Sequence, residues 1–164
     1  MTFIIEPMGA GDWEAVAAIY GKGIGTGDAT FETTVPDWSH WNDNHLTVGR
    51  LVARKDSRVI GWAALSPVSD RLVYAGVAEV SVYVAAVARG QGVGKKLLQT
   101  LVTQSEQNGI WTLQAGIFPE NEASVAIHQQ CGFRIVGRRE KLGQMGGHWR
   151  DVLLLERRSS VVRK

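Results

Sequence analysis

Apolar residues along this chain follow two kinds of pattern, of which the first is typical of β-strands. In several short segments they alternate with polar residues or form β-branched runs bounded by turn-forming residues. These segments cover residues 3–5, 51–54, 59–65, 77–84, 111–117, 133–136 and 149–155. The polar stretch between the second and third segments indicates a hairpin with a short turn. The sequence therefore predicts a protein rich in strands.

The second pattern places apolar residues three to five positions apart, which is typical of amphipathic helices. It occupies residues 13–20, 36–48, 95–107 and 122–131. Asp12 is positioned to cap the first of these helices. The run 21–27 has four glycines at alternate positions, so we expect it to end that helix and to form a mobile loop. Gly132 is expected to end the last helix.

The predicted elements follow the order βααβββαβαββ, in which hairpins are mixed with strand–helix–strand crossovers. This order favours a mixed sheet with helices on both faces. A chain of 164 residues, 45% of them hydrophobic and 21% charged, is long enough for one cored domain. We expect that domain to cover residues 1–156 and to be followed by a basic, frayed C-terminal tail over residues 157–164.

The charge distribution argues against a nucleic-acid partner. The formal net charge is +2, but Arg157, Arg158, Arg163 and Lys164 all lie in the predicted tail. Without these four residues, 14 basic residues face 16 acidic ones. A body of this kind lacks the clustered positive face that nucleic acids require.

Cysteine content and hydropathy indicate the cellular compartment in which the protein works. The single cysteine, Cys131, excludes an internal disulfide and has no metal-ligand spacing around it, so we expect a reducing compartment and no metal. The first residues do not resemble a signal peptide. The longest apolar run is far shorter than the ~20 residues of a membrane span. We therefore expect a cytoplasmic protein without a membrane partner.

A glycine-rich stretch, Arg89-Gly90-Gln91-Gly92-Val93-Gly94, joins the strand 77–84 to the helix that follows. Backbone N–H groups and the helix dipole converge at such a turn, which makes it a candidate anion site. The P-loop pattern fails because Arg89 and Lys96 replace its first glycine and its Ser or Thr. The dinucleotide pattern fails because Lys95 replaces its third glycine. Taken alone, the stretch could also be a turn chosen only for its backbone geometry.

This stretch resembles the Arg/Gln-x-x-Gly-x-Gly/Ala signature of the GNAT acetyltransferase superfamily. The segment from Arg71 and Tyr74 through Glu79 to Ser81-Val82-Tyr83-Val84 resembles that of phosphinothricin and methionine sulfoximine N-acetyltransferases, with Val77-Ala78 in place of the usual Thr-Val. Further similar motifs lie at 29–32, 121–133 and 147–151, so the resemblance runs from about residue 20 to residue 155. It implies an α+β GNAT fold with αβα layers and a mostly antiparallel central sheet. It also implies acetyl-CoA as co-substrate and a homodimer.

The same resemblance implies a set of cofactor-binding residues. The glycine-rich loop would hold the pyrophosphate of acetyl-CoA, and the preceding strand would pair with its pantetheine arm. A backbone N–H at Val84 or its neighbour would polarise the thioester oxygen. For Asn121 the alternative is a helix cap. The predicted set is Val82, Tyr83, Val84, Arg89, Gly90, Gln91, Gly92, Val93, Gly94, Lys95, Asn121 and Ser124.

Two residues are candidates for catalysis. Glu79 is a lone carboxylate in an apolar strand, where desolvation should raise its pKa and suit it to act as a general base. The alternative is a carboxylate in a buried hydrogen-bonded pair. His128 is the candidate acid for the leaving thiolate, and the alternative is a histidine packed beside the cofactor. Cys131 lies at a helix end and is expected to be a buried helix residue rather than a nucleophile.

The acceptor site is predicted around Arg71, which can hold a carboxylate by a two-pronged contact, and Tyr74, which can supply a wall and a hydroxyl. The alternative is a solvated arginine beside a tyrosine at the edge of the core. Further predicted walls are Phe31, Glu32 and Trp149, with Glu79 facing the amine. Some members of the subfamily have a histidine where this chain has Met145-Gly146, which leaves the acceptor open.

The resulting prediction is an N-acetyltransferase. It would transfer acetyl from acetyl-CoA to the α-amino group of a small amino acid or analogue, of the phosphinothricin or methionine sulfoximine type, by direct attack in a ternary complex. The alternatives are acetylation of a polyamine or a protein N-terminus, and a non-catalytic CoA-sensing domain. The tryptophan-rich segment 38–41 could form the dimer surface or pack on the core.

Overall fold

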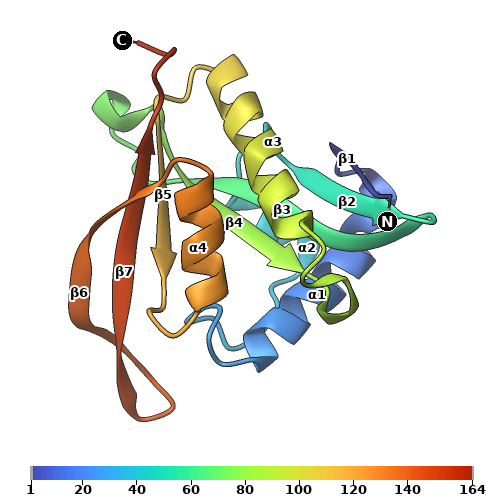
Figure 1. Ribbon diagram of the computed structural model, residues 1–164, viewed down its shortest axis with the longest axis horizontal. Helices are drawn as coiled ribbons and strands as arrows, with labels where there is room; N and C mark the ends of the chain where they lie inside the picture. The colour runs from blue at the N-terminus through green and yellow to red at the C-terminus, as the bar shows by residue number, and fades with distance from the viewer. Residues whose placement is uncertain (1, 164) are drawn as a thin grey trace.

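The computed structural model describes residues 2–163, which form a seven-stranded sheet with the strand order β1-β2-β3-β4-β5-β7-β6 (Figure 1). Neighbouring strands are antiparallel except for β4 and β5, which are parallel. The predicted order of strands and helices is confirmed. The strands are β1 (Ile4–Pro7), β2 (Leu51–Lys55), β3 (Arg58–Pro67), β4 (Val77–Val84), β5 (Thr112–Ile117), β6 (Arg134–Met145) and β7 (His148–Arg158).

Helices cover both faces of this sheet, as predicted. They are α1 (Trp13–Gly25), α2 (Trp38–Asp43), α3 (Val93–Gln107) and α4 (Glu122–Gln130), with short 3-10 turns η1 (Ala10–Asp12), η2 (Leu72–Tyr74) and η3 (Ala86–Ala88). Alternate residues of β3 face opposite sides. Trp62 packs with α1 and α2, whereas Ala63 and Leu65 pack with α3, which lies in front of the sheet in Figure 1. Within residues 2–163, no helix has the length and apolarity that crossing a membrane requires.

The first helix is longer than the sequence predicted. The glycine-rich run was expected to be a mobile loop from residue 21, and that prediction is wrong because α1 continues to Gly25. Gly23 is buried against the ring of Tyr83, and a Cβ at this position would lie 2.6 Å from Tyr83 Cδ2. Tertiary packing therefore requires a glycine inside the helix and outweighs its unfavourable helix propensity, about 1 kcal/mol relative to alanine.

The second helix is shorter than the predicted 36–48. Asp37 caps it by accepting a hydrogen bond from the His40 N–H at 2.8 Å, and the helix ends at Asp43. The guanidinium of Arg50 then donates to the carbonyls of Leu46 and His45 and so satisfies them without helical bonds. Trp41 is 1% exposed. Of the two roles left open for the tryptophan-rich segment, packing on the core is the one that the structure shows for Trp41.

The C-terminal hairpin is also longer than predicted. Residues 133–136 were expected to form a short strand, whereas β6 runs over twelve residues. Its partner β7 continues to Arg158, so the boundary expected after residue 156 cuts through a strand. Arg157 and Arg158 pair with β5, and Ser159 is buried. The prediction of a frayed tail is wrong at these positions.

The parallel strands β4 and β5 stay together for only three residue pairs, from Val77 and Thr112 to Glu79 and Gln114. Beyond these pairs β4 continues to Val84 and β5 to Ile117, and the two strands diverge (Figure 1). On its other edge β4 is paired with β3 from Ala78 to Val84. The edge of β4 that faces β5 therefore carries backbone groups without strand partners.

The packing of Gly23 generates a stability prediction with a matched control. Gly23→Ala should lower the free energy of unfolding by about 1–3 kcal/mol, because its methyl group overlaps the Tyr83 ring. Gly25→Ala places the same methyl group in open space in the same helix and should raise that free energy by about 0.5 kcal/mol. Urea unfolding followed by circular dichroism measures both. Equal effects of the two substitutions would contradict the prediction.

Candidate active site

The diverging strands open a cleft of about 870 Å³. Its walls come from β4, β5, the loop before α3, the first turns of α4, the loop between α1 and α2, and the β6–β7 hairpin. Most of the residues predicted for the site lie on this cleft. They are Phe31, Glu79, Val82, Tyr83, Val84, Arg89, Gly90, Gly92, Val93, Gly94, Lys95, Asn121, Ser124 and His128.

Five predicted residues are not on the cleft lining. Arg71 lies with its guanidinium carbon 5.5 Å from the centre of the Tyr74 ring, at the turn before β4, and Tyr74 is 46% exposed. This arrangement matches the alternative of a loop arginine beside a tyrosine. Glu32 is exposed, and Trp149 is 59% exposed on β7. Gln91 donates to the carbonyl of Val87 within its own loop.

The glycine-rich loop has the geometry of an anion site. Gly90 and Gly92 have φ angles of 77° and 81°, which strongly favour glycine at both positions. Helix α3 begins directly afterwards at Val93, and the N–H groups of its first turn have no intrahelical acceptors. The positive end of the helix dipole lies at the same point. This loop therefore fits a pyrophosphate group, held mainly by the backbone.

The open edge of β4 supplies a second set of backbone donors. The Ala85 N–H donates to the Ile60 carbonyl of β3 at 2.8 Å. Because successive residues of a strand direct their N–H groups to opposite edges, the N–H groups of Val82 and Val84 face the cleft. An extended chain with amide groups, such as pantetheine, can pair with this edge. The residues present therefore fit acetyl-CoA at both the loop and the strand.

Glu79 lies at the apex of the cleft, because its pairing with Gln114 is the last before the strands part. The side chain is partly buried, and its Oε1 accepts a hydrogen bond from Gln114 Nε2 at 3.1 Å. A neutral amide fixes the carboxylate without neutralising it, unlike an arginine or lysine partner. The hydrogen-bonded pair that was the alternative for Glu79 is thus present, with a neutral amide as the partner.

His128 is only 5% exposed, and its Nδ1 lies 2.7 Å from the carbonyl oxygen of Ser124. A carbonyl can only accept, so Nδ1 carries the proton and donates it. Burial lowers the pKa of His128, and the bond to Ser124 opposes this only in part. The imidazole is thus held neutral, with an unprotonated Nε2. This state favours the alternative of a packed histidine, and the general-acid role stays a prediction.

Asn121 caps α4, the alternative considered from the sequence. Its Oδ1 accepts from the Ser124 N–H at 3.3 Å. Its Nδ2 donates to the carbonyl of Asp28 at 3.3 Å, in the loop between α1 and α2. One side chain therefore links the cofactor end of the cleft to that loop.

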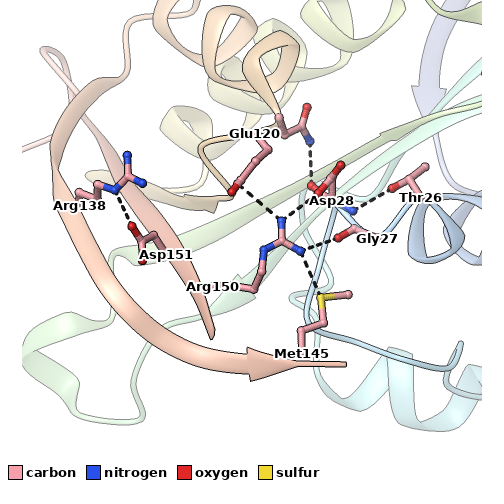
Figure 2. Close-up of polar contacts among 9 residues, drawn as sticks. Thr26, Gly27, Asp28, Glu120, Arg138, Met145, Arg150 and Asp151 are labelled. Carbon is pink, nitrogen blue, oxygen red and sulfur yellow. Dashed lines mark hydrogen bonds and ion pairs between the residues drawn. The ribbon is translucent and has the colours of Figure 1, made fainter. Parts of the chain in front are cut away.

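Sequence reasoning missed part of the cleft wall. The missed residues include Thr26, Asp28, Ala29, Thr30, Gln114, Phe118, Glu120, Arg139 and Leu142. The side chain of Arg150 braces this wall from β7 through contacts with Gly27, Asp28 and Glu120 (Figure 2). Arg139 pairs with Val152 across the hairpin, and both line the cleft. The motif at 29–32 contains Ala29 and Thr30, but it did not show that they line the cleft. Strand pairing brings Gln114, Arg139 and Leu142 to the cleft, and loop packing brings the others. Among residues 2–163, no cluster of three or more His, Cys, Asp or Glu side chains could hold a metal ion.

Comparison with known proteins places the chain in a family. The family model described as "Acetyltransferase (GNAT) family" matches residues 15–133. The phosphinothricin N-acetyltransferase of Alcaligenes faecalis is 36% identical over 153 residues, which are 89% of this chain and 77% of that protein. The L-methionine sulfoximine/L-methionine sulfone acetyltransferase of Pseudomonas aeruginosa is 31% identical, over 95% of this chain and 94% of that protein.

A solved structure agrees with these relatives. The GNAT superfamily phosphinothricin acetyltransferase of Sinorhizobium meliloti, solved in complex with acetyl-CoA, superposes with a TM-score of 0.87 at 28% identity. The match covers 99% of this chain and 96% of that one. The mostly antiparallel sheet with helices, predicted from the motifs, is confirmed. The chain therefore belongs to the GNAT acetyltransferase family and is an acetyl-CoA-dependent acyltransferase, as its motifs predicted.

Proposed function

We propose that the chain transfers the acetyl group of acetyl-CoA to the α-amino group of a small amino acid or analogue, of the phosphinothricin or methionine sulfoximine type. The observation that carries this proposal is the pair of opposite charges on the cleft, Glu79 at its apex and Arg139 on β6. An α-amino acid presents an ammonium and a carboxylate group, which these two side chains complement. The printed names of the relatives point to the same acceptor class.

At the cofactor end, the proposal assigns binding mainly to the backbone. Residues 90–95 would hold the pyrophosphate, and the open edge of β4 would pair with the pantetheine arm. Acetyl-CoA supplies an acetyl group activated as a thioester. The N–H of Val84 would donate to the thioester oxygen, where negative charge develops during attack.

At the apex, Glu79 would accept the proton of the acceptor ammonium, directly or through one water, and so free the amine to attack. Gln114 would hold the carboxylate in place through its hydrogen bond at 3.1 Å. The thiolate that leaves needs little acid assistance, because the pKa of a thiol is only about 8.5. The proposal therefore places His128 in the wall of the cofactor site and does not require a proton from it, and its general-acid role stays a prediction.

Arg139 is the proposed partner of the acceptor carboxylate. Within residues 2–163 its side chain makes no ion pair or hydrogen bond, whereas Arg150 on the same face is engaged by Asp28 and Glu120. A free guanidinium on a cleft wall can bind a carboxylate through two parallel hydrogen bonds. Arg71, predicted for this role from the sequence, is off the lining and is the alternative to be tested.

The rival functions fit the cleft less well. A polyamine carries several positive charges, which the free guanidinium of Arg139 would repel. A domain that only senses CoA has no need of a carboxylate where the strands part.

We still predict that the chain forms a single domain and that the protein lies in the cytoplasm.

We also propose that two copies form a homodimer through the β6–β7 hairpin. Apolar side chains stand exposed on these two strands, which form one end of the sheet. They are Ile135 (43% exposed), Val136 (44%) and Trp149 (59%). Clusters of exposed apolar side chains commonly mark interfaces.

The proposed function is tested by thiol release from acetyl-CoA with a panel of acceptors. Phosphinothricin, methionine sulfoximine and free amino acids should give the highest kcat/KM, and spermidine and an alanine-initiated peptide should give much lower values. Absence of turnover with every free amino acid would refute the proposal. Turnover confined to spermidine or the peptide would support an alternative acceptor class. Acetyl-CoA binding without any turnover would support the sensing role.

The role of Glu79 is tested by Glu79→Gln, which keeps the size of the side chain. We expect kcat to fall by about 100-fold or more, because a general base contributes 10²–10⁴-fold. The Kd of acetyl-CoA, measured by calorimetry, should stay within about twofold, since the backbone holds the cofactor. Glu140→Gln changes an exposed glutamate on β6 off the cleft lining and is the matched control. Wild-type turnover by Glu79→Gln would remove Glu79 as the base.

The carboxylate contact is tested by comparing an amino acid with its carboxamide as acceptors. Arg139→Gln should lower kcat/KM for the amino acid by about 10- to 100-fold, the loss expected for a charged hydrogen-bonded contact, and should affect the carboxamide little. Arg138→Gln, one residue away, is the control, because Arg138 bonds to Asp151 and is off the cleft lining. A selective loss in Arg71→Gln rather than in Arg139→Gln would return the role to Arg71.

A further inference from the structure

We propose that Arg150 is a positioning residue, which fixes the loop between α1 and α2 as the wall of the acceptor end of the cleft. It would control acceptor binding through this loop without touching either substrate. The part of the proposal that concerns the acceptor rests on the proposed function. The part that concerns the loop stands on the contacts of Arg150 alone.

The guanidinium of Arg150 joins segments that are far apart in the sequence (Figure 2). Nη1 donates to the Gly27 carbonyl at 2.8 Å, and Nη2 donates to Asp28 Oδ1 at 2.8 Å. Glu120 Oε2 lies 3.6 Å from Nη2, and the guanidinium carbon lies 4.0 Å from the centre of the Phe118 ring. Two of these contacts belong to the α1–α2 loop and two to the loop between β5 and α4. A single side chain on β7 therefore ties both loops to the sheet.

The burial of these groups indicates what the contacts do. The Arg150 side chain is 16% exposed, whereas those of Asp28 and Glu120 are 53% and 56% exposed. Ion pairs with such exposed carboxylates add only about 0–1 kcal/mol to stability. The planar guanidinium, in contrast, fixes the direction of several donors at once. We therefore expect its main effect on the position of the loop and a small effect on global stability.

The loop depends on side-chain contacts because residues 26–37 contain no helix or strand. Phe31 packs edge-on against Phe118, with ring centres 4.9 Å apart. A Cβ at Gly143 of β6 would lie 2.8 Å from Phe31 Cζ, so the ring also rests on the hairpin. Asn121 supplies the contact with the carbonyl of Asp28. Of these anchors, only Arg150 bonds to both Gly27 and Asp28.

The position of this loop matters because Thr26, Asp28, Ala29, Thr30 and Phe31 all line the cleft. A displaced loop would change the walls around the acceptor. The pyrophosphate loop before α3 does not touch Arg150, so acetyl-CoA binding should change much less. The expected signature is a raised KM for the acceptor with a nearly unchanged Kd for acetyl-CoA.

The experiment uses Arg150→Met, which keeps much of the side-chain bulk and removes the charge and the donors. Hydrogen exchange followed by mass spectrometry should show faster exchange in residues 26–32, where Asp28 and Glu32 N–H groups now bond to Thr26 and Thr30. The acceptor KM should rise about 5- to 10-fold, which corresponds to a loss of roughly 1 kcal/mol in the free energy of acceptor binding. Arg150→Lys, which keeps the charge but loses the planar fork, should be intermediate.

Arg138→Gln is the matched control, since it breaks an ion pair of the same hairpin, with Asp151, that does not reach the loop (Figure 2). It should leave both exchange and KM unchanged. If Arg150→Met does not fold, Asp28→Ala removes the side-chain acceptor on the loop instead and should speed exchange in the same segment.

Three results would overturn the proposal. One is wild-type exchange in Arg150→Met, or in Asp28→Ala if that variant is needed. Another is an equal effect of Arg138→Gln. The third is a raised KM without faster exchange, because Arg150 would then contact the acceptor directly. If the wild-type protein acetylates no amino acid, the proposed function fails, while the exchange measurement still decides the role of Arg150.

Discussion

The parting of β4 from β5 after three residue pairs is the constraint on which the site depends. Backbone groups inside a sheet normally find partners on both edges, so a strand that loses one neighbour presents a row of free donors and acceptors. The other edge of β4 is paired with β3 from Ala78 to Val84, which holds the strand in the sheet. Its open edge can therefore bind an extended amide chain, and the parting point places Glu79 where that edge begins. The cleft and its carboxylate result from one feature of strand pairing.

Local patterns predicted those parts of the molecule whose conformation is decided locally. The order of strands and helices followed from periodicity, and the turn at Gly90 and Gly92 from its spacing, because positive φ angles limit the choice of residue. The glycine run was wrongly predicted to be a loop rather than part of α1. Gly23 is needed there because the Tyr83 ring packs against it, and Tyr83 is 60 residues away in the sequence. The length of β6 was missed for the same reason, since its pairing with β7 is not visible in its own residues.

The arginines of the β6–β7 hairpin show how register separates side chains that look alike in the sequence. Arg138 and Arg139 are neighbours, and their side chains lie on opposite faces because strand residues alternate. Arg138 bonds to Asp151, while Arg139 reaches the cleft. Arg150 is two residues before Val152, so its side chain lies on the same face of the sheet. There it forms ion pairs with Asp28 and Glu120. The three cations thus have different chemical roles that composition and motif cannot distinguish.

The two ends of the cleft are built by different means, and this has a consequence for specificity. In our proposal, backbone N–H groups bind the cofactor, so this end depends on the glycines and the strand geometry more than on particular side chains. The proposed acceptor end is lined by side chains from the α1–α2 loop, the β5–α4 loop and the hairpin. We therefore expect substitutions there to alter acceptor binding more than acetyl-CoA binding. Asn121 connects the ends, since it caps α4 and also bonds to Asp28. The loop held by Arg150 is therefore the part of the proposed site where we expect the choice of amine to be set.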